Sequence, residues 1–164
     1  MRFLKPFFFG IFAALGALLL ELLVSFFLGA PSDLRPVFFS KMNLLLAVII
    51  LIEEIFIFIF VYKNFQELKN ASQKEIFYNS VALGLGFSFL EIFFNLFDLP
   101  SGQNILNLVL NFTGITAVHI ATAGIIGYSI MKAPKLNIVF IFRTLLIAFS
   151  IHFVYNYLII YNLA

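Results

Sequence analysis

Residues 43–62 read NLLLAVIILIEEIFIFIFVY, an almost unbroken apolar run with two adjacent acids, Glu53 and Glu54, near its centre. A helix needs roughly 20 mainly apolar residues to cross about 30 Å of hydrocarbon. The run has this length, so it predicts a transmembrane helix. An ionised carboxylate at the centre of such a helix costs about 2.5–3.5 kcal/mol, which makes both glutamates candidates for a functional role.

The composition of the whole chain agrees with this interpretation. Of 164 residues, 63% are hydrophobic and only 11% are charged, which is too much apolar surface for a soluble domain of this size. The chain has no cysteine, which excludes disulfides, thiol nucleophiles and cysteine-ligated metals. Its formal charge of +2 is small and dispersed, so we expect a lipid bilayer around it and no nucleic-acid partner.

Four further apolar runs have the length of a membrane span, and short polar segments separate them. We therefore predict an all-α fold, a polytopic integral membrane helix bundle that forms a single transmembrane domain over residues 1–164. Ser72 and Glu75 have the spacing of a capping box at the start of the third helix. The predicted spans lie near 7–29, 43–62, 76–97, 104–131 and 138–161.

The basic residues between the spans predict the orientation of the chain. One side of the predicted membrane carries Arg2, Lys5, Lys63, Lys69, Lys74, Lys132 and Lys135, and the other carries Arg35 and Lys41. Short cytoplasmic loops are enriched in Lys and Arg, so we expect the N-terminus in the cytoplasm. We expect the membrane to be the plasma membrane of a prokaryotic cell.

The two adjacent glutamates cannot face the same partner, because neighbouring residues on a helix point about 100° apart. One of them can line an internal cavity while the other pairs with a neighbouring helix. The alternative is a protonated pair that forms hydrogen bonds between helices. Glu21, in the first span, either makes a packing contact or lines the cavity.

Three other spans carry polar side chains at broadly similar depth. Glu91 belongs to a stripe of small and polar residues at helical spacing, and His119 lies among small residues on one face of its span. His152 and Asn156 are four residues apart, so an imidazole and a carboxamide can both donate to one oxygen, as an oxyanion requires. Carboxylates, imidazoles and an amide around a hydrated cavity suit activation of water for hydrolysis.

Four motifs, each on its own predicted span, resemble the PrsW family of intramembrane proteases. The motifs are Glu53-Glu54, GLGFSFLE over 84–91, HIATAGIIGY over 119–128 and HFVYN over 152–156. This family is related to the type II CAAX prenyl endopeptidases, which are also called glutamic intramembrane proteases. The resemblance implies a peptidase that cuts a membrane-anchored protein or peptide substrate.

The resemblance also implies roles for single residues. Glu53 would activate the attacking water as a general base, Glu54 would support it, and Glu91 would share the water or a metal. His152 and Asn156 would form the oxyanion site. We expect no metal or other cofactor; if zinc is used instead, its ligands would come from Glu53, Glu91, His119 and His152.

His119 matches a family histidine to which we assign a supporting role. The chain departs from the family at Ile57 and Phe58, where the first motif of the family continues with Lys or Arg. That cation would offset one of the two carboxylates. Our hypothesis is that Arg143 or His119 replaces it from another helix.

Three other functions are compatible with the same residues. A catalytically inactive relative would bind membrane proteins or lipids as a scaffold, and the missing cation is its main support. His119 and His152 could be the two axial ligands of a haem in an electron carrier. The intramembrane acids could also mark a proton or ion pathway.

Overall fold

The computed structural model describes residues 3–28, 41–68, 72–97, 104–133 and 137–163, and five α-helices account for nearly all of them. The helices are α1 (Leu4–Leu28), α2 (Lys41–Glu67), α3 (Gln73–Asn95), α4 (Ile105–Lys132) and α5 (Ile138–Leu163). There is no strand within these ranges. All five helices are long and apolar enough to cross a bilayer, so the chain is an all-α, multi-pass membrane protein.

The helices agree closely with the predicted spans. Their ends lie within three residues of the predicted ones, except that α2 continues five residues further, to Glu67. The capping box of α3 is present: Ser72 N donates to Glu75 Oε2 at 2.9 Å, and Glu75 N donates to Ser72 Oγ at 3.3 Å. The predicted breaks at 29–40, 69–71, 98–103 and 134–136, with Arg2, Arg35, Lys69 and Lys135, lie outside the described residues.

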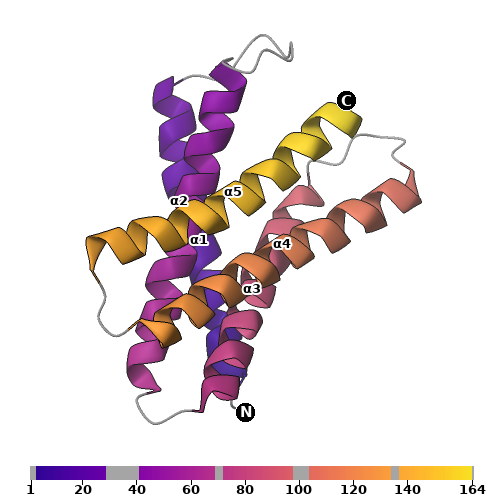
Figure 1. Ribbon diagram of the computed structural model, residues 1–164. Helices are drawn as coiled ribbons and strands as arrows, with labels where there is room; N and C mark the ends of the chain where they lie inside the picture. The colour runs from indigo at the N-terminus through magenta and orange to yellow at the C-terminus, as the bar shows by residue number, and fades with distance from the viewer. Residues whose placement is uncertain (1–2, 29–40, 69–71, 98–103, 134–136, 164) are drawn as a thin grey trace.

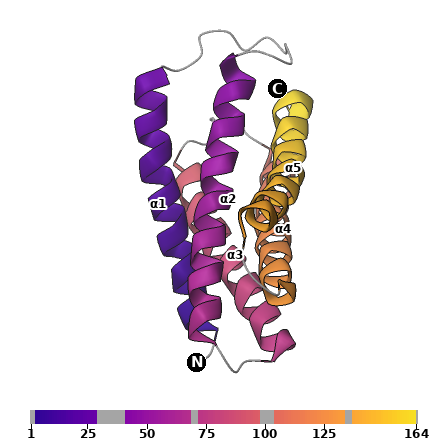
Figure 2. The same ribbon diagram turned by 60° about the vertical axis from the view of Figure 1, so that its left-hand side comes forward.

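The bundle is built around α2 and α3. Helix α2 contacts all four other helices, and α3 packs most extensively against α1 and α4. Figure 1 shows α4 and α5 crossing α1 and α2 obliquely, and Figure 2 shows α1 and α5 at opposite sides of the bundle. Within the described residues, α1 contacts neither α4 nor α5.

Glycines bring the backbones of α1, α3 and α4 into direct contact. A Cβ added at Gly10 would collide with the backbone oxygen of Leu83, and one at Gly84 would collide with the backbone oxygen of His119. Lipid tails are as apolar as leucine, so membrane helices associate through close packing of small residues. The close approach at Gly84 therefore holds the α4 backbone at His119 against α3.

Four of the described lysines lie at one end of the bundle, whereas Lys41, the first residue of α2, lies at the other. Lys5 is near the start of α1, Lys63 near the end of α2, Lys74 at the start of α3 and Lys132 at the end of α4. Lys5 Nζ lies 2.5 Å from Glu67 Oε2 at this end. The assignment of this end to the cytoplasm stays a prediction.

Candidate functional site

Helix α2 directs its two adjacent glutamates to different surroundings, as expected from their 100° separation. The Glu54 side chain is fully buried, and its Oε1 lies 2.8 Å from His152 Nδ1 on α5. The Glu53 side chain is turned into a pocket between the helices. One acid therefore ties α2 to α5 while the other is left facing the cavity.

His152 lies between the two carboxylates. Besides its bond to Glu54, its Nε2 is 3.5 Å from Glu53 Oε2. A lone pair on Nε2 facing a carboxylate oxygen would be repelled, so this geometry requires a proton on one of the two atoms. The imidazole between the two carboxylates is thus His152, whereas our hypothesis assigned the compensating group to Arg143 or His119. Arg143 is exposed on α5.

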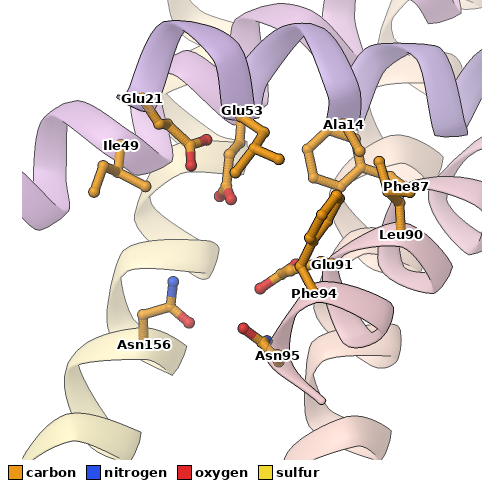
Figure 3. Close-up of a pocket in the computed structure, with 11 residues that line it drawn as sticks. Ala14, Glu21, Ile49, Glu53, Phe87, Leu90, Glu91, Phe94, Asn95 and Asn156 are labelled. Carbon is orange, nitrogen blue, oxygen red and sulfur yellow. The ribbon is translucent and has the colours of Figure 1, made fainter. Parts of the chain in front are cut away.

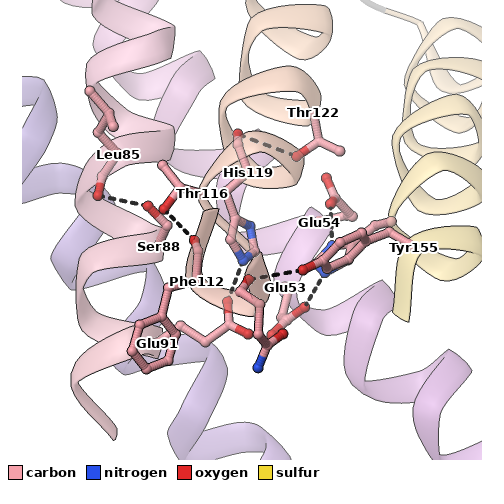
Figure 4. A network of polar contacts seen from close by, with 12 residues as sticks. Glu53, Glu54, Leu85, Ser88, Glu91, Phe112, Thr116, His119, Thr122 and Tyr155 are labelled. Atoms are coloured by element: carbon pink, nitrogen blue, oxygen red, sulfur yellow. Dashed lines mark hydrogen bonds and ion pairs between the residues drawn. The ribbon is translucent and has the colours of Figure 1, made fainter. Parts of the chain in front are cut away.

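A second imidazole–carboxylate pair joins α4 to α3. His119 Nε2 is bonded to Glu91 Oε2, and the His119 side chain is completely buried. The His119 ring also contacts the ring of Phe87, with centroids 4.5 Å apart, and the ring of His152, edge to face, with centroids 4.8 Å apart. The two pairs therefore form one continuous polar cluster across α2, α3, α4 and α5 (Figure 4).

The pocket beside this cluster has a volume of about 220 Å³ and is lined by α1, α2, α3 and α5. Its polar lining consists of three carboxyl groups and two carboxamides, from Glu21, Glu53, Glu91, Asn95 and Asn156. Figure 3 shows the Glu21 and Glu53 side chains on one wall, facing Asn156, Asn95 and Glu91 across the pocket. A water in this pocket would be surrounded by hydrogen-bonding groups.

Glu53 is the most unusual group in this lining. Its side chain is only 9% exposed, and its Oε2 has no hydrogen-bond partner among the described residues. Buried polar atoms in native proteins nearly always have a partner, either protein or ordered water. The unpaired Oε2 is the oxygen that lies 3.5 Å from His152 Nε2, so a proton between these two atoms would satisfy it.

The structure brings the predicted site residues together but separates two that we had paired. Asn156 lines the pocket, whereas His152 is 2% exposed and both of its nitrogens face carboxylates. The two side chains therefore do not present donors to one point in the cavity. His119 is likewise behind the pocket wall rather than in it.

We find no preformed site for either cofactor alternative among the described residues. The direct contact between the His119 and His152 rings leaves no space for a porphyrin between them. Within the described ranges, no three His, Asp or Glu side chains are grouped so that they could hold a metal ion. The four residues named as zinc ligands are held in two pairs within the polar cluster: Glu91 with His119, and Glu53 with His152.

Two lining residues had no predicted catalytic role. Glu21, which we left open, lies in the pocket wall contributed by α1. Asn95, four residues after Glu91, lies in the wall contributed by α3. A charge inside the first apolar run was the available signal for Glu21, and the helical spacing of Glu91 and Asn95 was the signal for Asn95.

No protein-family model, curated protein or solved structure matches this chain. Its function must therefore be inferred from the arrangement of its own residues.

Proposed function

We propose that this protein is a membrane-embedded peptidase that hydrolyses a peptide bond with water activated by Glu53. The observation that carries the proposal is the Glu53 carboxyl group, which is nearly buried, lines a polar pocket and has His152 beside its enclosed Oε2. A general base needs such a position, within hydrogen-bond reach of a water and close to the bond that is attacked. The pocket lies between membrane helices, so its substrate would be a membrane-anchored protein or peptide.

The chemistry would proceed in two steps. Glu53 accepts a proton from a water molecule as the water oxygen bonds to the carbonyl carbon of the substrate. The carbonyl oxygen becomes an oxyanion, to which the Asn156 side-chain amide donates a hydrogen bond. The C–N bond then breaks, and Glu53 returns its proton to the departing amine, which leaves a carboxylic acid and a free amine.

The two imidazoles would position the acids. His152 is held by the fully buried Glu54. It fixes the orientation of Glu53, and one proton is shared between His152 Nε2 and Glu53 Oε2. His119 fixes Glu91, whose side chain is 26% exposed and can orient the water from the opposite wall. Both are positioning residues, because each acts through a carboxylate that lines the pocket.

The motif resemblance supports the same reaction class. We propose that the chain is a PrsW-type glutamic intramembrane protease, that it belongs to the plasma membrane of a prokaryotic cell and that its lysine-rich end faces the cytoplasm. The Glu53–His152–Glu54 arrangement supports an active enzyme over an inactive scaffold, because His152 lies between the two carboxylates that a cation would balance.

A cleavage assay in proteoliposomes tests the proposal. The purified wild type and the variants Glu53→Gln, Glu91→Gln and His152→Ala are incubated with a set of hydrophobic helical peptides, and products are identified by mass spectrometry. We expect Glu53→Gln to lower the cleavage rate at least about 100-fold, the usual contribution of a general base. Glu67→Gln, on the outer surface of the lysine-rich end, is the matched control and should cleave normally.

Equal cleavage by wild type and all three site variants would contradict the proposal. Proton flux that depends on Glu53, without cleavage of any peptide, would identify a proton pathway instead. Binding of peptides without cleavage or flux would identify a scaffold.

A further inference from the structure

The acidic groups around the pocket outnumber the basic groups that could balance them. Three carboxyl groups line the pocket, the buried Glu54 is next to Glu53 on α2, and no described Lys or Arg is part of the lining. The two neighbouring imidazoles can offset at most two of these four acids. If all four acids are ionised, a net charge of −2 remains in a low-dielectric region, where unpaired charge is costly.

The two acids without a close basic partner are Glu53 and Glu21. Glu91 is paired with His119, and Glu54 with His152. Glu53 has only a long contact to His152, and one of its buried oxygens has no hydrogen-bond partner. Glu21 forms no hydrogen bond or ion pair with any described residue and lies beside Glu53 in the pocket wall.

The size of the pocket favours an organic cation. Its volume of about 220 Å³ exceeds that of an engineered cavity of about 150 Å³ that accommodates benzene. The apolar walls, including Leu18, Ile49 and Leu90, suit the methylene stem of a long side chain whose charged head reaches the acids. The described acids and imidazoles are not grouped as ligands of a metal ion.

We infer that Glu21 is a specificity residue, which binds the ammonium or guanidinium group of a Lys or Arg side chain next to the scissile bond of the substrate. The inference rests on the proposed function and adds the class of substrate. The basic side chain would lie along the apolar wall with its head at Glu21, and the adjacent carbonyl would then face Glu53 and Asn156. A neutral side chain of the same length would leave Glu21 without a partner.

A binding experiment tests this inference independently of catalysis. The probes are fluorescent Leu/Ala peptides of about 20 residues, one with a central Lys and one with the uncharged norleucine at the same position. Their dissociation constants are measured for the wild type, Glu21→Gln and the control Glu67→Gln in detergent micelles. We expect the wild type and the control to bind the Lys peptide about tenfold more tightly, the effect of one charge-assisted hydrogen bond.

Glu21→Gln should bind the two peptides equally, and Glu21→Lys should prefer a third peptide with a central Glu. Equal binding by the wild type, or an unchanged Lys preference in Glu21→Gln, would overturn the inference. The comparison of the Lys and norleucine peptides on the wild type tests the inference even if a variant does not fold. A Lys preference in binding without any cleavage would support the cation site and refute the peptidase. Cleavage without a Lys preference would support the peptidase and refute the cation site.

Discussion

At the scale of single residues, the buried Glu54–His152 pair is the most consequential contact for stability. Glu54 is fully buried and His152 nearly so, and their atoms are 2.8 Å apart. Removal of one partner leaves the other buried without a partner for its charge. The resulting loss of stability is larger than the stability that the intact pair contributes. The pair is therefore expected to be far more sensitive to a single substitution than to a double one.

We predict that His152→Ala lowers the free energy of unfolding by about 3 kcal/mol. Ser150→Ala on the same helix is the control, because Ser150 is exposed and donates only to the carbonyl of Leu146 in its own helix. Denaturation in mixed micelles measures both. If the double variant Glu54→Ala/His152→Ala lost the full sum of the two single effects, the pair would not be coupled.

Asn156 provides a second prediction at this scale. Its carboxamide lines the pocket and forms no hydrogen bond with the described residues, so it is free to bind an oxyanion. We expect Asn156→Ala to lower kcat about 100-fold or more with little change in KM, as loss of one oxyanion donor does. Asn107→Ala, at an exposed position of α4, should leave both constants unchanged. A rise in KM alone would assign Asn156 to substrate binding.

At the scale of helices, contact between α3 and α4 positions the second imidazole. A Cβ at Gly84 would collide with the backbone of α4 at His119, which cannot move aside as a flexible side chain would. We expect Gly84→Ala to cost about 1–3 kcal/mol of stability and to reduce cleavage, because α4 carries His119 away from Glu91. Thermal unfolding and the cleavage assay measure the two effects.

Gly124→Ala is the matched control for this substitution. Gly124 is also a helical glycine, but a Cβ there would come no closer than 3.4 Å to the ring of Phe77, an ordinary contact. It should be close to neutral in stability and activity. Equal effects of the two substitutions would show that helix propensity, rather than the approach of α3 and α4, accounts for the loss.

The sequence predicted the helices better than it predicted their contacts. Hydropathy and length determine where a span begins and ends, and the 3.6-residue period determines which residues share a face. The period therefore separated Glu53 from Glu54 correctly. The rotation of each helix depends on which glycines meet which backbones, and no period shows this. For that reason His152 was expected in the cavity with Asn156, yet it lies between two carboxylates.

At the scale of the whole molecule, the lysine-rich end of the bundle allows a direct test of orientation. The chain has no cysteine, so single-cysteine variants need no other substitution. Lys74→Cys marks the start of α3, and Phe97→Cys marks the region after its end, where Phe97 is exposed. In intact cells a membrane-impermeant maleimide should label Phe97→Cys, and Lys74→Cys only after permeabilisation. The reverse pattern would invert the predicted topology.

The lack of contact between α1 and α5 has a mechanical consequence. Both helices contribute side chains to the pocket, yet within the described ranges they do not touch each other. In a bundle whose pocket is closed by packed helices, those helices must separate before a substrate can enter from the lipid. Here there is no direct seam between α1 and α5 to open, because α2 lies between them and packs against both. A substrate that enters beside α1 or α5 should accordingly disturb the packing of that helix against α2 and leave the other helix in place.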